Sequence, residues 1–167
     1  MAMPMNWKKG RGKLGILTPL LGTWHAHADA PDGRPGRVQC TRHFVKDLHD
    51  TYVVLTAIWD LGDKTYEERC FFGCDAAKNL RFWSFTSDGK QSNGELTEAT
   101  DIHPQAIAFI AQMPAGIARL SYWPDEASGF HFAVESKSQK GWNRFVHHHY
   151  LAVAEIQTAI STTQTAQ

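Results

Sequence analysis

The sequence lacks the features that mark several large classes of protein. Its 167 residues contain no run of about 18 consecutive apolar residues, the length that crosses a bilayer as a helix, and only three cysteines. Seventeen Lys and Arg balance seventeen Asp and Glu, so no net charge attracts nucleic acid or an anionic membrane. With 43% hydrophobic residues, the chain is expected to form one globular domain with neither a nucleic-acid nor a membrane partner.

Familiar catalytic spacings are missing as well. The chain has no Cys-x-x-Cys pair and no His-Glu-x-x-His motif, which excludes the common sequence signatures of a redox dithiol and a zinc hydrolase. Glu67 and Glu68 are adjacent, but neighbours on a strand point to opposite faces and cannot share a proton. No catalytic residue is therefore predicted, and the chain is interpreted as a binding protein rather than an enzyme.

The N-terminal residues and the cysteines bear on the compartment. Residues 1–13 carry four basic residues and no acidic one, and glycines interrupt them before any apolar stretch of a secretory signal can form. Cys70 and Cys74 lie four apart on an expected strand, roughly 13 Å from each other, so they cannot pair there. Reduced thiols and a flexible basic leader over residues 1–13 predict a cytoplasmic protein.

Turn signals recur along the chain at nearly even intervals, as at Asp88-Gly89 and Ser128-Gly129. The segments between them are rich in β-branched and aromatic residues, which favour strands. The expected strands are 22–29, 36–47, 51–60, 65–74, 79–87, 93–101, 106–112, 116–123, 129–137 and 142–153. A short helical turn is expected over residues 13–21.

Ten successive antiparallel strands pose an edge problem. An open sheet of this length leaves two rows of unpaired backbone groups, and closure into a barrel removes both. We therefore predict an all-β fold, a single antiparallel up-and-down β-barrel of about ten strands over residues 14–153, preceded by a short N-terminal helix. A two-sheet sandwich is the alternative, and residues 154–167 are expected to form a polar C-terminal tail.

The start of the barrel carries residues of a known pattern. The segment LTPLLGTW, residues 17–24, resembles the entrance of the calycin superfamily, in which a short helix runs into Gly-x-Trp on the first strand. Segments 72–75 and 82–89 resemble the middle strands of small bacterial lipocalin-like domains related to the nitrobindin haem-binding barrels. The resemblance implies that Gly22 permits a tight helix-to-strand entry and that Trp24 plugs the closed end of the barrel.

Two departures from this pattern change what the resemblance implies. Many lipocalin-like proteins stack an arginine of the last strand on the plug tryptophan, but this chain has Ala152 near that place, so the cation–π contact is expected to be absent. The glycine-rich first strand of the nitrobindins is replaced by HAHAD, residues 25–29. Haem is therefore kept only as an alternative ligand.

Strand alternation predicts which side chains face the lumen. We assign the more apolar or aromatic set of each strand to the interior, which gives an aromatic lining with a few hydroxyl groups. The predicted ligand-lining residues are Trp24, Phe82, Ser84, Leu120, Tyr122, Phe132, Val146, His148 and Tyr150. Such a lining suits a small hydrophobic or aromatic ligand with one or two polar anchor points, although the same side chains can simply fill a narrow barrel.

The run His147, His148 and His149 places one histidine on one face of the last strand and two on the other. His148 shares its face with Val146 and Tyr150, so we predict that it points inward. The resemblance implies that an inward histidine on this strand could ligate haem iron axially, whereas a hydrogen-bonded core histidine is the simpler interpretation. A slip of one residue in register would exchange His148 for its two neighbours.

The outward histidines raise the question of a metal. In a closed barrel the first and last strands adjoin, so His25 and His27 could approach His147 and His149 and hold zinc or nickel. Rings two apart on a strand lie about 6–7 Å from each other, and Asp29 is the one nearby carboxylate. We interpret these histidines as a solvated face and predict no metal site.

The segment 51–60 is apolar on both faces, with Val54 and Ile58 on one side and Leu55 and Trp59 on the other. A barrel wall buries one face only, so the other needs a cover. We assign Leu55 and Trp59 to the outside and predict a homodimer through this surface. The alternative cover is the basic leader or the tail over residues 154–167.

The predicted function is non-catalytic binding of a small hydrophobic or aromatic ligand in the barrel lumen. The alternatives are a haem-binding protein of the nitrobindin kind and a lipocalin-fold enzyme acting on a small aromatic substrate. An enzyme would be favoured by polar groups converging in the lumen, above all Glu68 with Tyr66.

Overall fold

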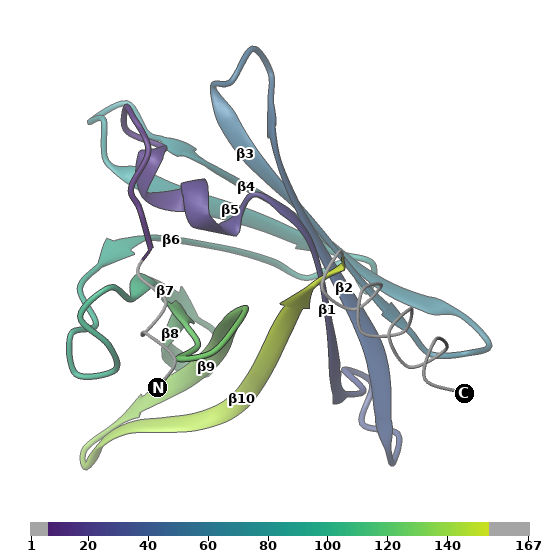
Figure 1. The fold of residues 1–167 in the computed structure, drawn as a ribbon. Coiled ribbons are helices and arrows are strands. Elements are labelled where there is room, and N and C mark those ends of the chain that lie inside the picture. The colour runs from purple at the N-terminus through teal and green to yellow at the C-terminus, as the bar shows by residue number, and fades with distance from the viewer. Residues whose placement is uncertain (1–6, 154–167) are drawn as a thin grey trace.

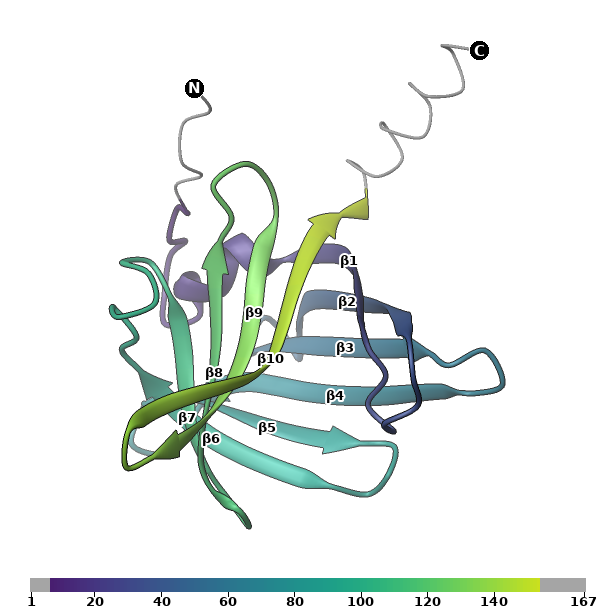
Figure 2. The same ribbon diagram turned by 90° about the horizontal axis from the view of Figure 1, so that it is seen from below.

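The computed structural model describes residues 7–153, which form a closed antiparallel barrel of ten strands. The elements are the 3-10 helix η1 (Gly15–Leu20) and the strands β1 (Gly22–Asp29), β2 (Arg37–Asp47), β3 (Tyr52–Asp60), β4 (Thr65–Cys74), β5 (Leu80–Thr86), β6 (Gln91–Thr97), β7 (Ile107–Met113), β8 (Gly116–Pro124), β9 (Phe130–Ser138) and β10 (Gly141–Ala152). Consecutive strands are neighbours around the sheet, and β1 pairs with β10 (Figures 1 and 2). The predicted up-and-down barrel is confirmed, and the sandwich is excluded.

Strand β6 departs most from its predicted range. It begins at Gln91 because a tight turn precedes it, in which Gly89 N donates to Thr86 O at 2.9 Å. It ends at Thr97 because the chain then turns on itself, with Ile102 N donating to Ala99 O at 3.0 Å. Neither turn depends on hydrophobic alternation, which is why the alternation alone placed this strand two to four residues too late.

The closed end of the barrel has the expected entrance. The helix is a short 3-10 piece that contains Pro19, whose missing N–H and ring limit its extension. Gly22 follows with φ +124°, a conformation that L side chains rarely adopt. Trp24 then donates from Nε1 to Leu20 O at 2.8 Å and lies opposite Ala152 on β10.

No arginine covers Trp24 within residues 7–153, as Ala152 predicted. The cover comes instead from Phe130, whose ring meets the Trp24 ring edge to face at 4.8 Å between centroids. Phe130 is fully buried and stacks on Tyr150 at 5.2 Å. Aromatic packing thus replaces the expected cation–π contact at this end.

Part of the predicted leader lies against the barrel. Trp7 N donates to Gln105 Oε1 at 3.1 Å, Gln105 Nε2 donates to Trp7 O at 3.0 Å, and the Trp7 ring packs on Phe130. Further along, Lys13 Nζ donates to Lys78 O at 3.0 Å. From Trp7 onwards the basic segment is therefore held in place, whereas the predicted tail over residues 154–167 lies outside the described residues.

Strand β3 corrects one prediction. Leu55 is buried in the interior, opposite Phe44 on β2 and Cys70 on β4, and Trp59 lies at the mouth of the lumen. The predicted outward face is therefore the inward one, and Val54 lies on the outside with Ile58. Because both faces are apolar, alternation could not choose between them, and pairing with the interior residues of β2 and β4 decides the matter. The homodimer stays a prediction, without the Leu55 and Trp59 surface that motivated it.

Candidate functional site

The lumen divides into a filled half and an open half. Near the closed end, rings of Phe44, Phe72, Phe82 and Phe109 pack within 6.5 Å of one another in successive pairs. They leave an enclosed space of about 30 Å³. Towards the open end lies a cavity of about 420 Å³, within the range of small-ligand sites.

The wall of this cavity is mostly apolar. Trp59, Leu120, Phe132, Val134 and Val146 contribute side chains from β3, β8, β9 and β10. β8, β9 and β10 are neighbours in the sheet and β3 is not adjacent to them, so residues far apart in the sequence enclose one space. The cavity suits a ligand with an apolar or aromatic body.

Among the residues that the structure describes, Arg42 is the one arginine that lines both spaces of the lumen, and the residue is 2% exposed. Its Nε donates to the Tyr150 hydroxyl at 2.9 Å, and its Nη1 donates to the Tyr122 hydroxyl at 2.8 Å. The guanidinium carbon lies 4.0 Å from the centroid of the Phe132 ring, a cation–π contact. Two tyrosines and one ring thus fix the orientation of a buried cation.

The positive charge of Arg42 is incompletely paired. Within residues 7–153, its Nη2 has no hydrogen-bond partner and no carboxylate forms an ion pair with it. A buried charge without an ionic partner costs several kcal/mol, and guanidinium groups bind carboxylates through two parallel hydrogen bonds. The free donors of Arg42 therefore make this part of the cavity suited to an anionic group.

Tyr150 connects Arg42 to His148. The Tyr150 hydroxyl lies 2.8 Å from His148 Nδ1 and 3.1 Å from Cys40 Sγ. Burial, followed by the nearby Arg42 charge, lowers the pKa of His148 to about 3, so its ring is neutral at neutral pH. The hydroxyl accepts from Arg42 and donates to the neutral ring, which gives a chain of hydrogen bonds in the order Arg42, Tyr150, His148.

Glu68 lines both spaces together with Arg42, and its charge, against the effect of burial, helps to raise the Arg42 pKa, although the two groups form no hydrogen bond or ion pair within residues 7–153. Its carboxylate accepts a hydrogen bond from the Ser84 hydroxyl. Tyr66 packs edge to face on Trp59 at 5.4 Å, and its hydroxyl has no hydrogen-bond partner within residues 7–153. Glu68 and Tyr66 share a face, as predicted, but the hydrogen bond of Glu68 goes to Ser84 and not to Tyr66.

The predicted lining residues do not all line the same space. Leu120, Phe132, Val146 and His148 line the open cavity. The others lie deeper or behind the lining: Trp24 at the closed end, Phe82 and Tyr122 beside the enclosed space, Ser84 on Glu68, and Tyr150 behind Arg42.

Sequence reasoning missed Arg42, which organises the site. The signal was present, because Cys40, Arg42 and Phe44 alternate on one face of β2, and a charge between two apolar neighbours on an inward face is unusual. It also missed Trp59 as a lining residue, because that residue was assigned to the outer face.

The surroundings of His148 do not fit haem. Its Nδ1 is engaged with Tyr150, and the Arg42 guanidinium lies over the ring of Phe132, which itself packs 5.8 Å from His148. A cation and two phenol hydroxyls thus make this part of the lumen polar, and the deeper space measures only about 30 Å³. The residues present favour a smaller anionic ligand.

The fold and the cavity together define a closed ten-stranded β-barrel with an internal, ligand-sized space. No family model and no curated protein matches the sequence. In residues 7–153, no helix has the length and apolar character needed to span a membrane. Membership of the calycin superfamily, like the cytoplasmic location, stays a prediction from the sequence.

Proposed function

We propose that this barrel binds, without transforming it, a small molecule that has an apolar or aromatic body and one acidic group. The observation that carries the proposal is Arg42, a buried cation with unused hydrogen-bond donors beside an apolar cavity of about 420 Å³. An acidic group on the ligand would pair with the guanidinium, and the body would occupy the space between Trp59, Leu120 and Val134.

The titration behaviour of the site supports binding over acid–base catalysis. Burial raises the pKa of both Tyr122 and Tyr150, against the opposing effect of Arg42, so the phenols stay protonated. The pKa of His148 falls to about 3, too low for an efficient general base at neutral pH. The pKa values of these three groups around Arg42 are therefore shifted away from neutral pH, where proton transfer would require them.

The test compares two ligands of the same body. Isothermal titration calorimetry is performed with 1-naphthoate and with naphthalene-1-methanol, which lacks the negative charge. We expect the acid to bind roughly tenfold or more tightly than the alcohol, because a hydrogen bond to a charged group contributes about 1.5–3 kcal/mol. Replacing Arg42 with Met should remove this difference, whereas Arg69→Met, on the outer face of β4, should leave it unchanged.

Further measurements separate the parts of the proposal. Val134→Trp fills the cavity and should abolish binding of both compounds, which distinguishes the lumen from the surface. Equal binding of acid and alcohol by the parent protein would refute the role of Arg42 but leave lumen binding standing. If neither compound binds at millimolar concentration, lumen binding of this ligand class is refuted. A His148-dependent Soret shift on titration with haemin would favour the haem alternative instead.

A further inference from the structure

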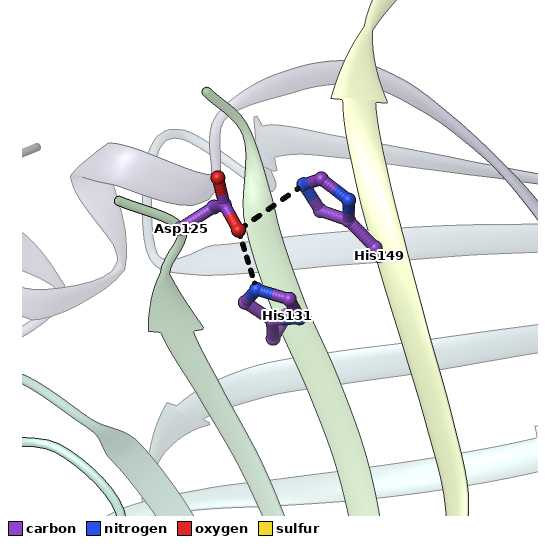
Figure 3. Close-up of side chains that lie close together, drawn as sticks. All are labelled: Asp125, His131 and His149. Atoms are coloured by element: carbon purple, nitrogen blue, oxygen red, sulfur yellow. Dashed lines mark hydrogen bonds and ion pairs between the residues drawn. The ribbon is translucent and has the colours of Figure 1, made fainter. Parts of the chain in front are cut away.

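A second cluster of chemical groups lies on the outer surface of the barrel, and none of its three residues lines the cavity. Asp125, His131 and His149 each direct one potential ligand atom to a common point, and these atoms all lie within 4.8 Å of one another. Asp125 Oδ1 is 2.7 Å from His131 Nε2 and 3.7 Å from His149 Nε2 (Figure 3). None of the three takes part in the Arg42 network.

Strand pairing brings the two histidines together. His131 on β9 and His149 on β10 are directly opposite each other in the antiparallel ladder. Their rings stack at 4.7 Å between centroids with an interplanar angle of 17°. The sheet itself therefore holds two imidazoles side by side, with little side-chain freedom left to lose on binding an ion.

The turn after β8 holds the carboxylate in place. Asp125 Oδ2 accepts hydrogen bonds from Ala127 N at 2.9 Å and Ser128 N at 3.2 Å. The other oxygen, Oδ1, stays directed at the two rings. Despite partial burial, these backbone bonds and His131 lower the pKa of Asp125 to about 2, so the group is an anion at neutral pH.

A further layer of contacts orients the His131 ring. His131 Nδ1 lies 2.9 Å from His147 Nε2, and the ring stacks on Trp123 at 5.3 Å with an angle of 19°. When a ring nitrogen of histidine binds a metal, the other nitrogen usually donates to a neighbouring acceptor. His147 can provide that acceptor, so His131 has a partner for each of its two nitrogens.

We propose that Asp125 Oδ1, His131 Nε2 and His149 Nε2 form a binding site for a divalent transition metal of the zinc class. Zn–N and Zn–O bonds of about 2.0–2.1 Å in a tetrahedron place ligand atoms about 3.3 Å apart, and the 2.7 and 3.7 Å separations bracket that value. Two imidazoles with one carboxylate favour zinc, copper or nickel over magnesium and calcium.

The ion would replace existing hydrogen bonds. In its absence, His131 Nε2–H donates to Asp125, and His149 Nε2–H donates to Ser128 O at 3.0 Å. On binding, both nitrogens must present lone pairs, so each ring keeps its proton on Nδ1 instead. His149 is half exposed, so the ion can enter from solvent and the fourth coordination position remains open to water.

This set differs from the one considered from the sequence. His25 and His27 line one surface pocket with His149, but His25 Nδ1 is engaged with Thr41 Oγ1 at 3.0 Å and lies 3.2 Å from Gln39 Nε2, and neither histidine belongs to the cluster. His149 was among the histidines considered from the sequence. Its partners in the cluster, His131 on β9 and Asp125 in the turn after β8, were not, because they lie on neither the first nor the last strand.

The test uses the full chain after removal of metals with EDTA. Calorimetric titration with Zn²⁺ should give one equivalent, and Co²⁺ should give the intense visible absorption of a four-coordinate site. We expect His131→Ala, His149→Ala and Asp125→Asn each to weaken Zn²⁺ binding by about tenfold or more. His27→Ala and His43→Ala, which also remove outward histidines, should leave the affinity unchanged.

Circular dichroism shows whether each variant still folds. Asp125→Asn keeps the size and shape of its side chain, so it tests the site even if a histidine variant fails to fold. Zn²⁺ binding that survives in Asp125→Asn, His131→Ala and His149→Ala alike would overturn the proposal, as would an equal loss in His27→Ala. Either result would mean that the metal binds the surface histidines without the arrangement around Asp125.

Discussion

At the scale of single residues, the barrel depends on one phenol. The Tyr150 hydroxyl is shared by Arg42 Nε, His148 Nδ1 and Cys40 Sγ, all of which are buried. Each of these groups has lost its water on folding, and a buried polar group without a partner costs about 1–3 kcal/mol. Tyr150 is therefore important for stability as well as for the orientation of Arg42.

Replacing Tyr150 with Phe should lower the free energy of unfolding by about 1–3 kcal/mol, because Arg42 and His148 each lose a partner while the ring and its packing remain. Urea unfolding followed by tryptophan fluorescence measures the change. Tyr66→Phe is the matched control, since its hydroxyl has no hydrogen-bond partner within residues 7–153. Equal losses in the two variants would contradict the network.

At the scale of elements, β3 shows how a strand with two apolar faces acquires its orientation. Val53, Leu55, Ala57 and Trp59 are buried towards the interior, whereas Thr56 points outward between His43 and Arg69. The orientation follows from pairing: the interior residues of β2 and β4 lie beside the first set. A shift of one residue would expose Leu55 and bury a polar threonine.

Two substitutions on neighbouring positions of β3 test this orientation. Leu55→Asp should destabilise the protein by more than about 4 kcal/mol, because it places a carboxylate in the apolar interior. Thr56→Asp should change the stability by no more than about 0.5 kcal/mol, since its side chain is in contact with solvent and lies near Arg69. Thermal unfolding followed by circular dichroism compares them. The reverse order of stability would show that the outer face carries Leu55.

At the scale of the whole molecule, closure rests on a short seam. β1 and β10 pair at Trp24 with Ala152 and at His25 with Leu151, whereas β1 and β2 pair along the whole of β1, from Gly22 to Asp29. Closure removes the exposed sheet edges and also brings Arg42 of β2 beside Tyr150 of β10. The seam is thus the shortest ladder among the described strands, and in the order of the sheet it lies between β2 and β10, which carry Arg42 and Tyr150.

Hydrogen exchange should detect the seam as the place where the barrel opens first. Amides of residues 151–152 are expected to exchange roughly tenfold or more faster than those of residues 130–134, because local opening breaks few hydrogen bonds there. Exchange followed by NMR in heavy water gives both rates. Saturation with a ligand whose acidic group pairs with Arg42 should slow exchange at the seam. Equal exchange rates in the two segments would refute this order of opening.

The sequence by itself determined the class of fold and the chemistry available to it. Even spacing of turns and strand composition are local properties, and the ten antiparallel strands followed from them. The entrance at Gly22 and Trp24, with Ala152 near Trp24, was expected from the resemblance to calycin entrances. Alternation also gave the inward direction of His148 beside Tyr150, because both lie on a strand with one polar and one apolar side.

Only the tertiary structure decided which residues meet. The inward face of β3, the contacts of Arg42 with tyrosines from β8 and β10, and the approach of Asp125 to His131 and His149 all depend on register and closure. Alternation relates positions within one strand and says nothing about distances across the barrel. In a closed sheet, a small difference in register gives each residue different neighbours. Those neighbours determine whether the buried charge and the histidines are placed to bind a ligand or a metal.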